Sequence, residues 1–136
     1  MILPENGSVV VIDDDPNQAM PIILAMSKNG IATTYYRGIK EDELPEKPLG
    51  GVRLAIVDLQ LLPTDNDGHT IATRLINVLQ KIIGPQNGPY MLLVWSLKDH
   101  LFGEDFRSTI KNHDNHLVPV CIATLDKSSC LNRVEN

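Results

Sequence analysis

The sequence predicts an α/β fold: an open, mostly parallel sheet of five strands with helices on both faces. Two observations predict it. Five short apolar runs, several rich in β-branched residues, recur along the 136 residues, and helical patterns separate most of them. Strands that alternate with helices favour a parallel sheet, because each helix returns the chain to the edge of the sheet where the previous strand began. In addition, acids and other polar residues follow the runs at the positions where strands would end.

The five predicted strands are short apolar segments bounded by polar or turn-forming residues. They are Ser8–Ile12, Ile31–Tyr36, Arg53–Leu59, Tyr90–Trp95 and Leu117–Leu125. Pro119 predicts a sheet-edge position for the last strand, because proline has no N–H to donate to a neighbouring strand. Cys121 is expected to be a core residue of that strand.

Three helices are predicted between the strands, at about Pro16–Asn29, at about His69–Ile83 and at Glu104–His113. Asp15 can cap the first helix, and Pro16 suits its first turn. Pro21 predicts that this helix starts later or is kinked, because an internal proline removes a helical hydrogen bond. The segment Lys40–Gly51, broken by prolines and glycines, predicts one short helix at most.

The chain is expected to form a single domain over residues 1–136. Only nine residues follow Lys127, which is too few for a full closing helix, so we expect the last helix to be short or missing. Such a chain is either the N-terminal part of a longer protein or a domain with a shortened last element.

Composition narrows the function classes. The net charge of −5 and the absence of clustered Lys and Arg argue against nucleic-acid binding by this domain. No apolar run approaches the roughly 20 residues that span a membrane, and the N-terminus does not resemble a signal peptide. Two cysteines do not make a disulfide framework. We therefore expect a cytoplasmic protein.

The predicted strand ends bring chemistry-bearing residues to one edge of the sheet, where open α/β proteins bind their ligands. Asp13 and Asp14 follow the first strand, Asp58 ends the third, Ser96 follows the fourth and Lys127 follows the fifth. Three carboxylates so close would repel one another unless a cation joined them, and Mg²⁺ prefers such oxygen ligands. Lys127 and the Ser96 hydroxyl can contact the remaining oxygens of a bound phosphoryl group.

Four segments in this order, VVVIDDDPN, LAIVDLQL, LLVWS and ATLDK, resemble the receiver domain of bacterial two-component response regulators. The resemblance runs from about Ser8 to Lys127. It implies a flavodoxin-like fold and a phosphoacceptor signalling domain that catalyses its own phosphorylation rather than turning over a substrate. It also implies a sensor histidine kinase or a phosphotransfer protein as phosphodonor, and an output domain or partner protein.

The resemblance also implies site roles. Asp58 would be the nucleophile that attacks the phosphorus of a phosphohistidine. Mg²⁺ would be held by Asp14, by Asp13 directly or through water, by Asp58 and by the backbone carbonyl of Gln60. Ser96 and Lys127 would bind phosphoryl oxygens.

Two alternatives stay open. Ser128 follows Lys127 where the family usually has proline, and Thr124 stands where it often has Tyr or Phe. These departures allow a pseudo-receiver, a protein-interaction module without phosphorylation. The second alternative is a Mg²⁺-dependent phosphatase of the haloacid-dehalogenase type.

In a phosphatase of that type, Asp13 would be the nucleophile and Asp15 the general acid, and Ser96 and Lys127 would hold the phosphate. Against it, the acidic motif expected after the lysine strand is missing, and Asp58 would have no role.

Overall fold

The computed structural model describes residues 9–38, 41–58, 68–96 and 102–126. Their centre is one five-stranded sheet, in which every pair of neighbouring strands is parallel. The strands are β1 (Val9–Ile12), β2 (Thr33–Tyr36), β3 (Leu54–Asp58), β4 (Met91–Ser96) and β5 (Cys121–Asp126). The order β2-β1-β3-β4-β5 is that of flavodoxin-like folds, with the topological switch between β1 and β3. The predicted fold class is confirmed, and β5 lies at a sheet edge as predicted.

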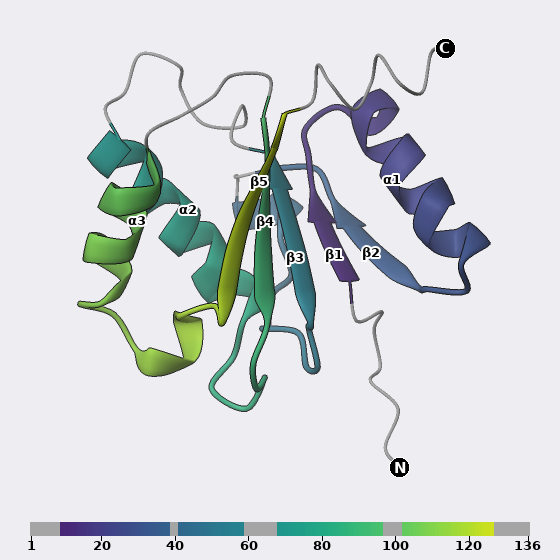
Figure 1. Ribbon diagram of the computed structural model, residues 1–136. Helices are drawn as coiled ribbons and strands as arrows, with labels where there is room; N and C mark the ends of the chain where they lie inside the picture. Colours follow the sequence, from purple (N-terminus) through teal and green to yellow (C-terminus); the bar gives the residue numbers. More distant parts are fainter. Residues whose placement is uncertain (1–8, 39–40, 59–67, 97–101, 127–136) are drawn as a thin grey trace.

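The helices lie on both faces of the sheet (Figure 1). Helix α1 (Pro16–Lys28) covers one face, and α2 (Gly68–Ile82) and α3 (Phe102–Ile110) cover the other. Two 3₁₀ turns, η1 (Glu41–Glu43) and η3 (Asn115–Leu117), complete the described helical segments. The segment after β5, where the last helix was expected to be short or missing, lies outside the described residues.

Helix α1 starts at Pro16 and continues through Pro21, so the later start that Pro21 predicted is wrong. The Asp15 side chain caps the helix by accepting a hydrogen bond from the Asn17 N–H at 2.9 Å. Pro16 has the backbone angle of a first-turn residue. The cap and the packing of Ala19 against the sheet together outweigh the one hydrogen bond that Pro21 cannot make.

Strand residues alternate between two cores, as the pleat of a β-strand requires. Val10 and Ile12 of β1 face the larger core, which α2 and α3 close. Val9 and Val11 face a smaller core under α1. Because both sides of β1 are buried, this strand is a continuous apolar run rather than an alternating one.

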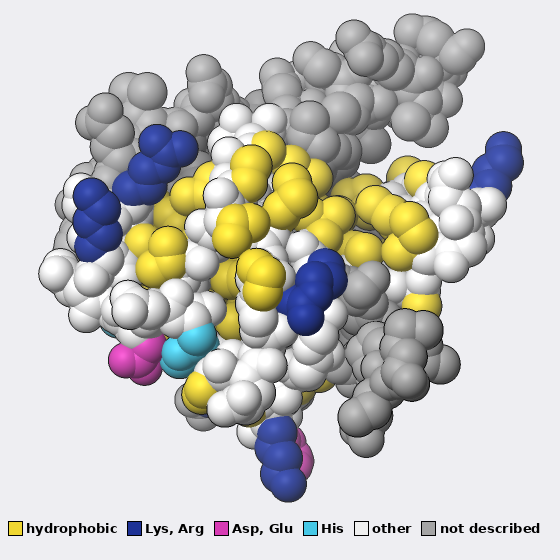
Figure 2. Space-filling model, turned by 60° about the horizontal axis from the view of Figure 1, so that its bottom comes forward, with side chains coloured by type: hydrophobic (Ala, Val, Ile, Leu, Met, Phe, Trp, Pro, Cys, Tyr) yellow, Lys and Arg dark blue, Asp and Glu magenta, His cyan; other side chains and the backbone are white. Residues whose placement is uncertain are grey.

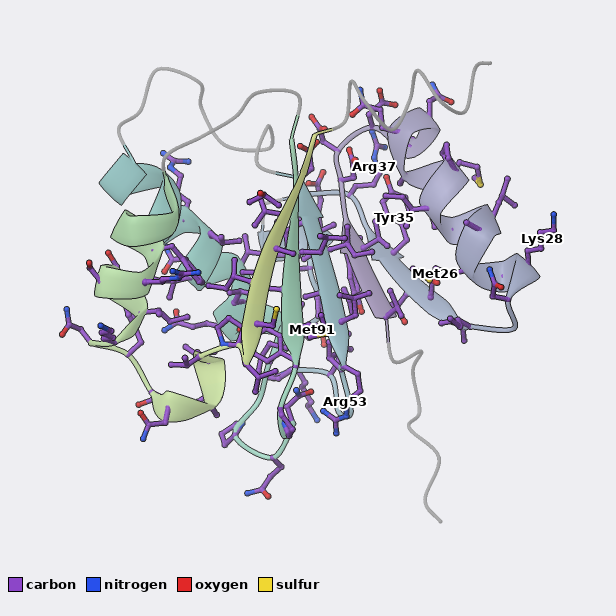
Figure 3. The ribbon with its side chains drawn as sticks, viewed as in Figure 1. Met26, Lys28, Tyr35, Arg37, Arg53 and Met91 are labelled. Atoms are coloured by element: carbon purple, nitrogen blue, oxygen red, sulfur yellow. The ribbon has the colours of Figure 1, made fainter. Side chains whose placement is uncertain are left out.

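Among the described residues, helix α1 covers only part of its face of the sheet (Figure 1). Met91 of β4 is 45% exposed, and Cys121, its register partner on β5, is also exposed. Met26 of α1 packs on the smaller core, whereas Met91 lies away from α1 (Figure 3). Figure 2 shows hydrophobic side chains gathered over a broad area of the surface seen in that view. The prediction of Cys121 as a core residue is therefore wrong: in the described part of the chain, no helix packs over that side of β5.

Candidate functional site

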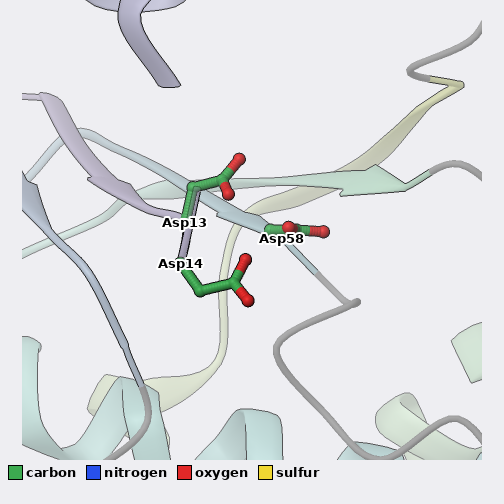
Figure 4. A group of neighbouring side chains, drawn as sticks. All are labelled: Asp13, Asp14 and Asp58. Atoms are coloured by element: carbon green, nitrogen blue, oxygen red, sulfur yellow. The ribbon is translucent and has the colours of Figure 1, made fainter. Parts of the chain in front are cut away.

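Three carboxylates lie close together at the carboxyl ends of β1 and β3, where the strand order of the sheet switches. Asp13 and Asp14 directly follow β1, and Asp58 is the last residue of the neighbouring strand β3. The register places Ile12 beside Val57, so the residues that follow in each strand are also neighbours. One carboxylate oxygen from each of the three acids lies within 4.8 Å of the other two (Figure 4). The grouping expected for these acids is confirmed.

The three acids differ in their exposure to solvent. Asp13 and Asp58 are 1% and 2% exposed, whereas Asp14 is exposed. Carboxylates are rarely buried unless other groups compensate for lost hydration. Two buried acids and one solvent-facing acid therefore form a cluster with a closed inner side and an open outer side.

Asp13 is held through its backbone and its side chain. Its N–H donates to the carbonyl oxygen of Tyr36 at 3.1 Å, and its own carbonyl oxygen accepts from the Tyr35 hydroxyl at 2.7 Å. Its Oδ1 accepts from the Asp15 N–H at 2.9 Å. The end of β2 and the start of α1 thus fix this residue from two sides.

Residues at the end of β2 were missed by sequence reasoning. Burial of the Tyr35 phenol raises its pKa above the ordinary value of 10.0, and the nearby Asp13 carboxylate raises it further. The exposed Arg37 opposes this shift in the Tyr35 pKa. The available signal was the strand order itself: in a flavodoxin-like sheet β2 borders β1, so polar groups at its carboxyl end lie beside the acids.

The other predicted site residues fall at or beyond the limits of the described chain. Ser96 is the last residue of β4 and pairs with Asp126 of β5, while Asp58 pairs with Trp95. The backbone of Ser96 therefore lies at the same sheet edge as the acids, and its side chain is outside the described atoms. Lys127 and Gln60 lie outside the described residues, and their roles stay predictions.

The donor set suits a hard divalent cation. All three candidate ligands are carboxylate oxygens, which Mg²⁺ and Ca²⁺ prefer, whereas Zn²⁺ sites usually contain His or Cys. The open side at Asp14 leaves room for water or for oxygens of a bound anion. Among the described residues, these three acids are the only group of His, Cys, Asp or Glu side chains close enough together to hold a metal ion.

The comparisons with known proteins give two similarities and no family model that matches. The chain is 28% identical over 76 residues to the pre-mRNA-splicing factor SNU114 of Saccharomyces cerevisiae. The aligned residues make up 56% of this chain and only 7% of that protein. Among solved structures, it is similar to the non-phosphorylated HemR receiver domain from Leptospira biflexa. That match has 15% sequence identity and a TM-score of 0.49, and it covers 93% of this chain and 90% of the other.

The fold class rests on the strand order described above. None of the helices among the described residues has the length and apolar character needed to cross a membrane.

Proposed function

We propose that this chain is a receiver-type signalling domain that accepts a phosphoryl group on Asp58 in a Mg²⁺-dependent reaction. The observation that supports the proposal most directly is the grouping of Asp13, Asp14 and Asp58 within 4.8 Å at the carboxyl edge of the sheet. A phosphoryl group in this position would lie at the usual ligand site of a flavodoxin-like fold.

The proposed reaction forms one bond and breaks one bond. A carboxylate oxygen of Asp58 attacks the phosphorus of a phosphohistidine, and the bond from phosphorus to the imidazole nitrogen breaks. The leaving imidazole takes up a proton. Asp13, Asp14 and Asp58 would hold the Mg²⁺ ion, which would supply positive charge to the phosphoryl oxygens. Asp58 suits the role of acceptor because it ends a buried strand and its position is fixed by the pairing of β3 with β4.

The other residues of the site would bind the cation or the phosphoryl oxygens. Asp14, at the open side, and the buried Asp13 would hold the cation together with Asp58, and the Gln60 carbonyl would add a ligand. Ser96 and Lys127 would bind phosphoryl oxygens, since a hydroxyl and an ammonium donate to them readily. The donor of the phosphoryl group would be a sensor histidine kinase or phosphotransfer protein in the cytoplasm. An output domain or partner protein would respond to the new charge.

One contact argues against the haloacid-dehalogenase-type alternative. That chemistry assigns Asp15 as general acid, but the Asp15 carboxylate accepts a hydrogen bond from the Asn17 N–H at the start of α1. The Asp15 side chain therefore has a structural role as the N-cap of α1.

The test is intact-protein mass spectrometry after incubation with acetyl phosphate and Mg²⁺. The wild-type chain should gain one phosphoryl group, and Asp58→Asn should gain none. Omission of Mg²⁺ should also prevent the gain. Asp15→Asn is the matched control: it changes an acid of the same segment but keeps an N-cap side chain, so it should be phosphorylated as the wild type is.

Two outcomes would contradict the proposal. A gain that persists in Asp58→Asn and is lost in Asp13→Asn would assign the nucleophile to Asp13. A folded wild-type chain that gains no mass would leave the pseudo-receiver as the better description.

A further inference from the structure

Tyr35 connects two neighbouring strands at the acidic cluster. It lies on β2, 22 positions after Asp13 in the sequence, and its hydroxyl donates to the Asp13 carbonyl oxygen at 2.7 Å. Figure 3 shows Tyr35 on the α1 side of the sheet, near Arg37. The phenol is partly buried against the smaller core, so packing holds the ring while its hydroxyl reaches the strand end.

The accepting carbonyl belongs to the peptide that joins Asp13 to Asp14. A peptide unit is planar, so a bond that fixes the Asp13 oxygen also fixes the N–H and Cα of Asp14. The Asp13 N–H is already bound to the Tyr36 carbonyl. With both of its backbone groups held by β2, Asp13 cannot rotate without breaking a hydrogen bond. This constraint fixes the backbone position from which the exposed Asp14 side chain extends.

We propose that Tyr35 is a positioning residue for the cation site: its hydroxyl aims Asp14 and thereby sets the affinity for Mg²⁺ and the preference for Mg²⁺ over Ca²⁺. The inference rests on the proposed function, because it takes the acidic cluster as the metal site. Mg²⁺ requires near-ideal octahedral geometry, whereas Ca²⁺ accepts longer bonds and irregular arrangements. Loss of the tether therefore weakens Mg²⁺ binding more than Ca²⁺ binding.

The test compares Tyr35→Phe with Tyr36→Phe in the full chain, with isothermal titration of MgCl₂ and CaCl₂ separately. Both variants remove one phenolic oxygen from adjacent residues. Tyr36 packs against the larger core, on the opposite face of the sheet, which makes it the matched control. Tyr35→Phe should raise the Kd for Mg²⁺ by about 10-fold to 100-fold, the usual effect of losing a group that orients a metal ligand. The Kd for Ca²⁺ should rise several-fold less, and Tyr36→Phe should leave both values within about twofold.

A double-mutant cycle separates positioning from general destabilisation. In an Asp14→Asn background, Tyr35→Phe should weaken Mg²⁺ binding by less than about threefold, because the side chain that it aims is already compromised. Urea unfolding of every variant identifies the fraction folded at the titration temperature, and the titrations are done where all variants are folded.

Three results would overturn the inference: an unchanged Mg²⁺ affinity in Tyr35→Phe, equal losses for Mg²⁺ and Ca²⁺, or a wild-type chain that binds no Mg²⁺. Failure of the proposed function gives a different pattern. If the wild type binds Mg²⁺ with the expected dependence on Tyr35 but is not phosphorylated at Asp58, the positioning role stands and the phosphoacceptor role does not.

Discussion

At the scale of single residues, the site depends on how acids of equal charge are brought together. Asp13 and Asp58 are buried and Asp14 is exposed, yet their carboxylate oxygens approach within 4.8 Å. Two unit negative charges at this distance repel by about 1 kcal/mol even when water screens them fully. This repulsion contributes unfavourably to stability, and a bound cation would offset it.

Neutralising Asp14 should consequently have opposite effects in two buffers. Without divalent ions, Asp14→Asn should raise the free energy of unfolding by about 0.5 kcal/mol, because one like-charge contact is removed. With saturating Mg²⁺, the wild type should be the more stable protein, since binding to the folded state adds stability. Urea unfolding with EDTA and then with Mg²⁺ measures both effects. If Asp14→Asn is destabilising in both buffers, the cluster is not under charge repulsion.

At the scale of elements, the ends of some helices and strands follow from the residue pattern of their own segment, whereas others depend on contacts with distant segments. The predicted helix from about His69 to Ile83 is found as α2, one residue displaced at each end, because its apolar residues recur with helical spacing. The start of β4, by contrast, depends on a buried contact between distant segments. Asn87, 2% exposed, accepts from the Val52 N–H at 2.8 Å and donates to the Val52 carbonyl at 3.0 Å.

Asn87→Ala should destabilise the protein by about 1–3 kcal/mol, the usual cost of a buried polar group that loses its hydrogen-bond partner. The buried Val52 N–H would lose its acceptor, whereas the Val52 carbonyl would keep the hydrogen bond that the Arg53 side chain donates at 2.8 Å. Chemical denaturation measures the loss. Gln86→Ala, at an exposed position of the same loop, is the control and should change stability by less than about 0.5 kcal/mol. Equal effects of the two changes would show that Asn87 has no special part in joining β3 to β4.

At the scale of the whole molecule, the two faces of the sheet are covered unequally. Helices α2 and α3 close the larger core, while α1 covers only part of the opposite face. Figure 2 shows apolar side chains gathered on one side of the molecule, and Met91 of β4, on the face that α1 covers only in part, is 45% exposed. The position of Cys121 on this face is a direct check on that arrangement.

Cys121 should react with iodoacetamide in the folded protein at a rate close to that of an unfolded peptide, because the thiol is exposed. Peptide-level mass spectrometry separates its labelling from that of Cys130. The matched control is Ala72→Cys on α2, at a position with 0% exposure, where labelling should wait for rare unfolding and be at least about a hundredfold slower. Protection of Cys121 comparable to that of the control would mean that its side of β5 is covered in solution.

Much of the candidate site was predictable because it depends on strand ends. Asp13, Asp14 and Asp58 each follow an apolar run, and parallel strands place their carboxyl ends at one edge regardless of the details of packing. Tyr35 was not predictable in the same way. Nothing in its own segment distinguishes a tyrosine that reaches a neighbouring strand from one that packs in a core, as the adjacent Tyr36 does.

The sequence by itself determined the alternation of strands and helices, the parallel sheet and the edge at which the acids gather. These features arise from residue periodicity and turn chemistry, which act over a few residues. The tertiary structure decided that Cys121 is exposed, that α1 runs through Pro21 and that Tyr35 holds the Asp13 carbonyl. Those outcomes depend on which surfaces meet across the sheet, and residues far apart in the chain contribute to them together.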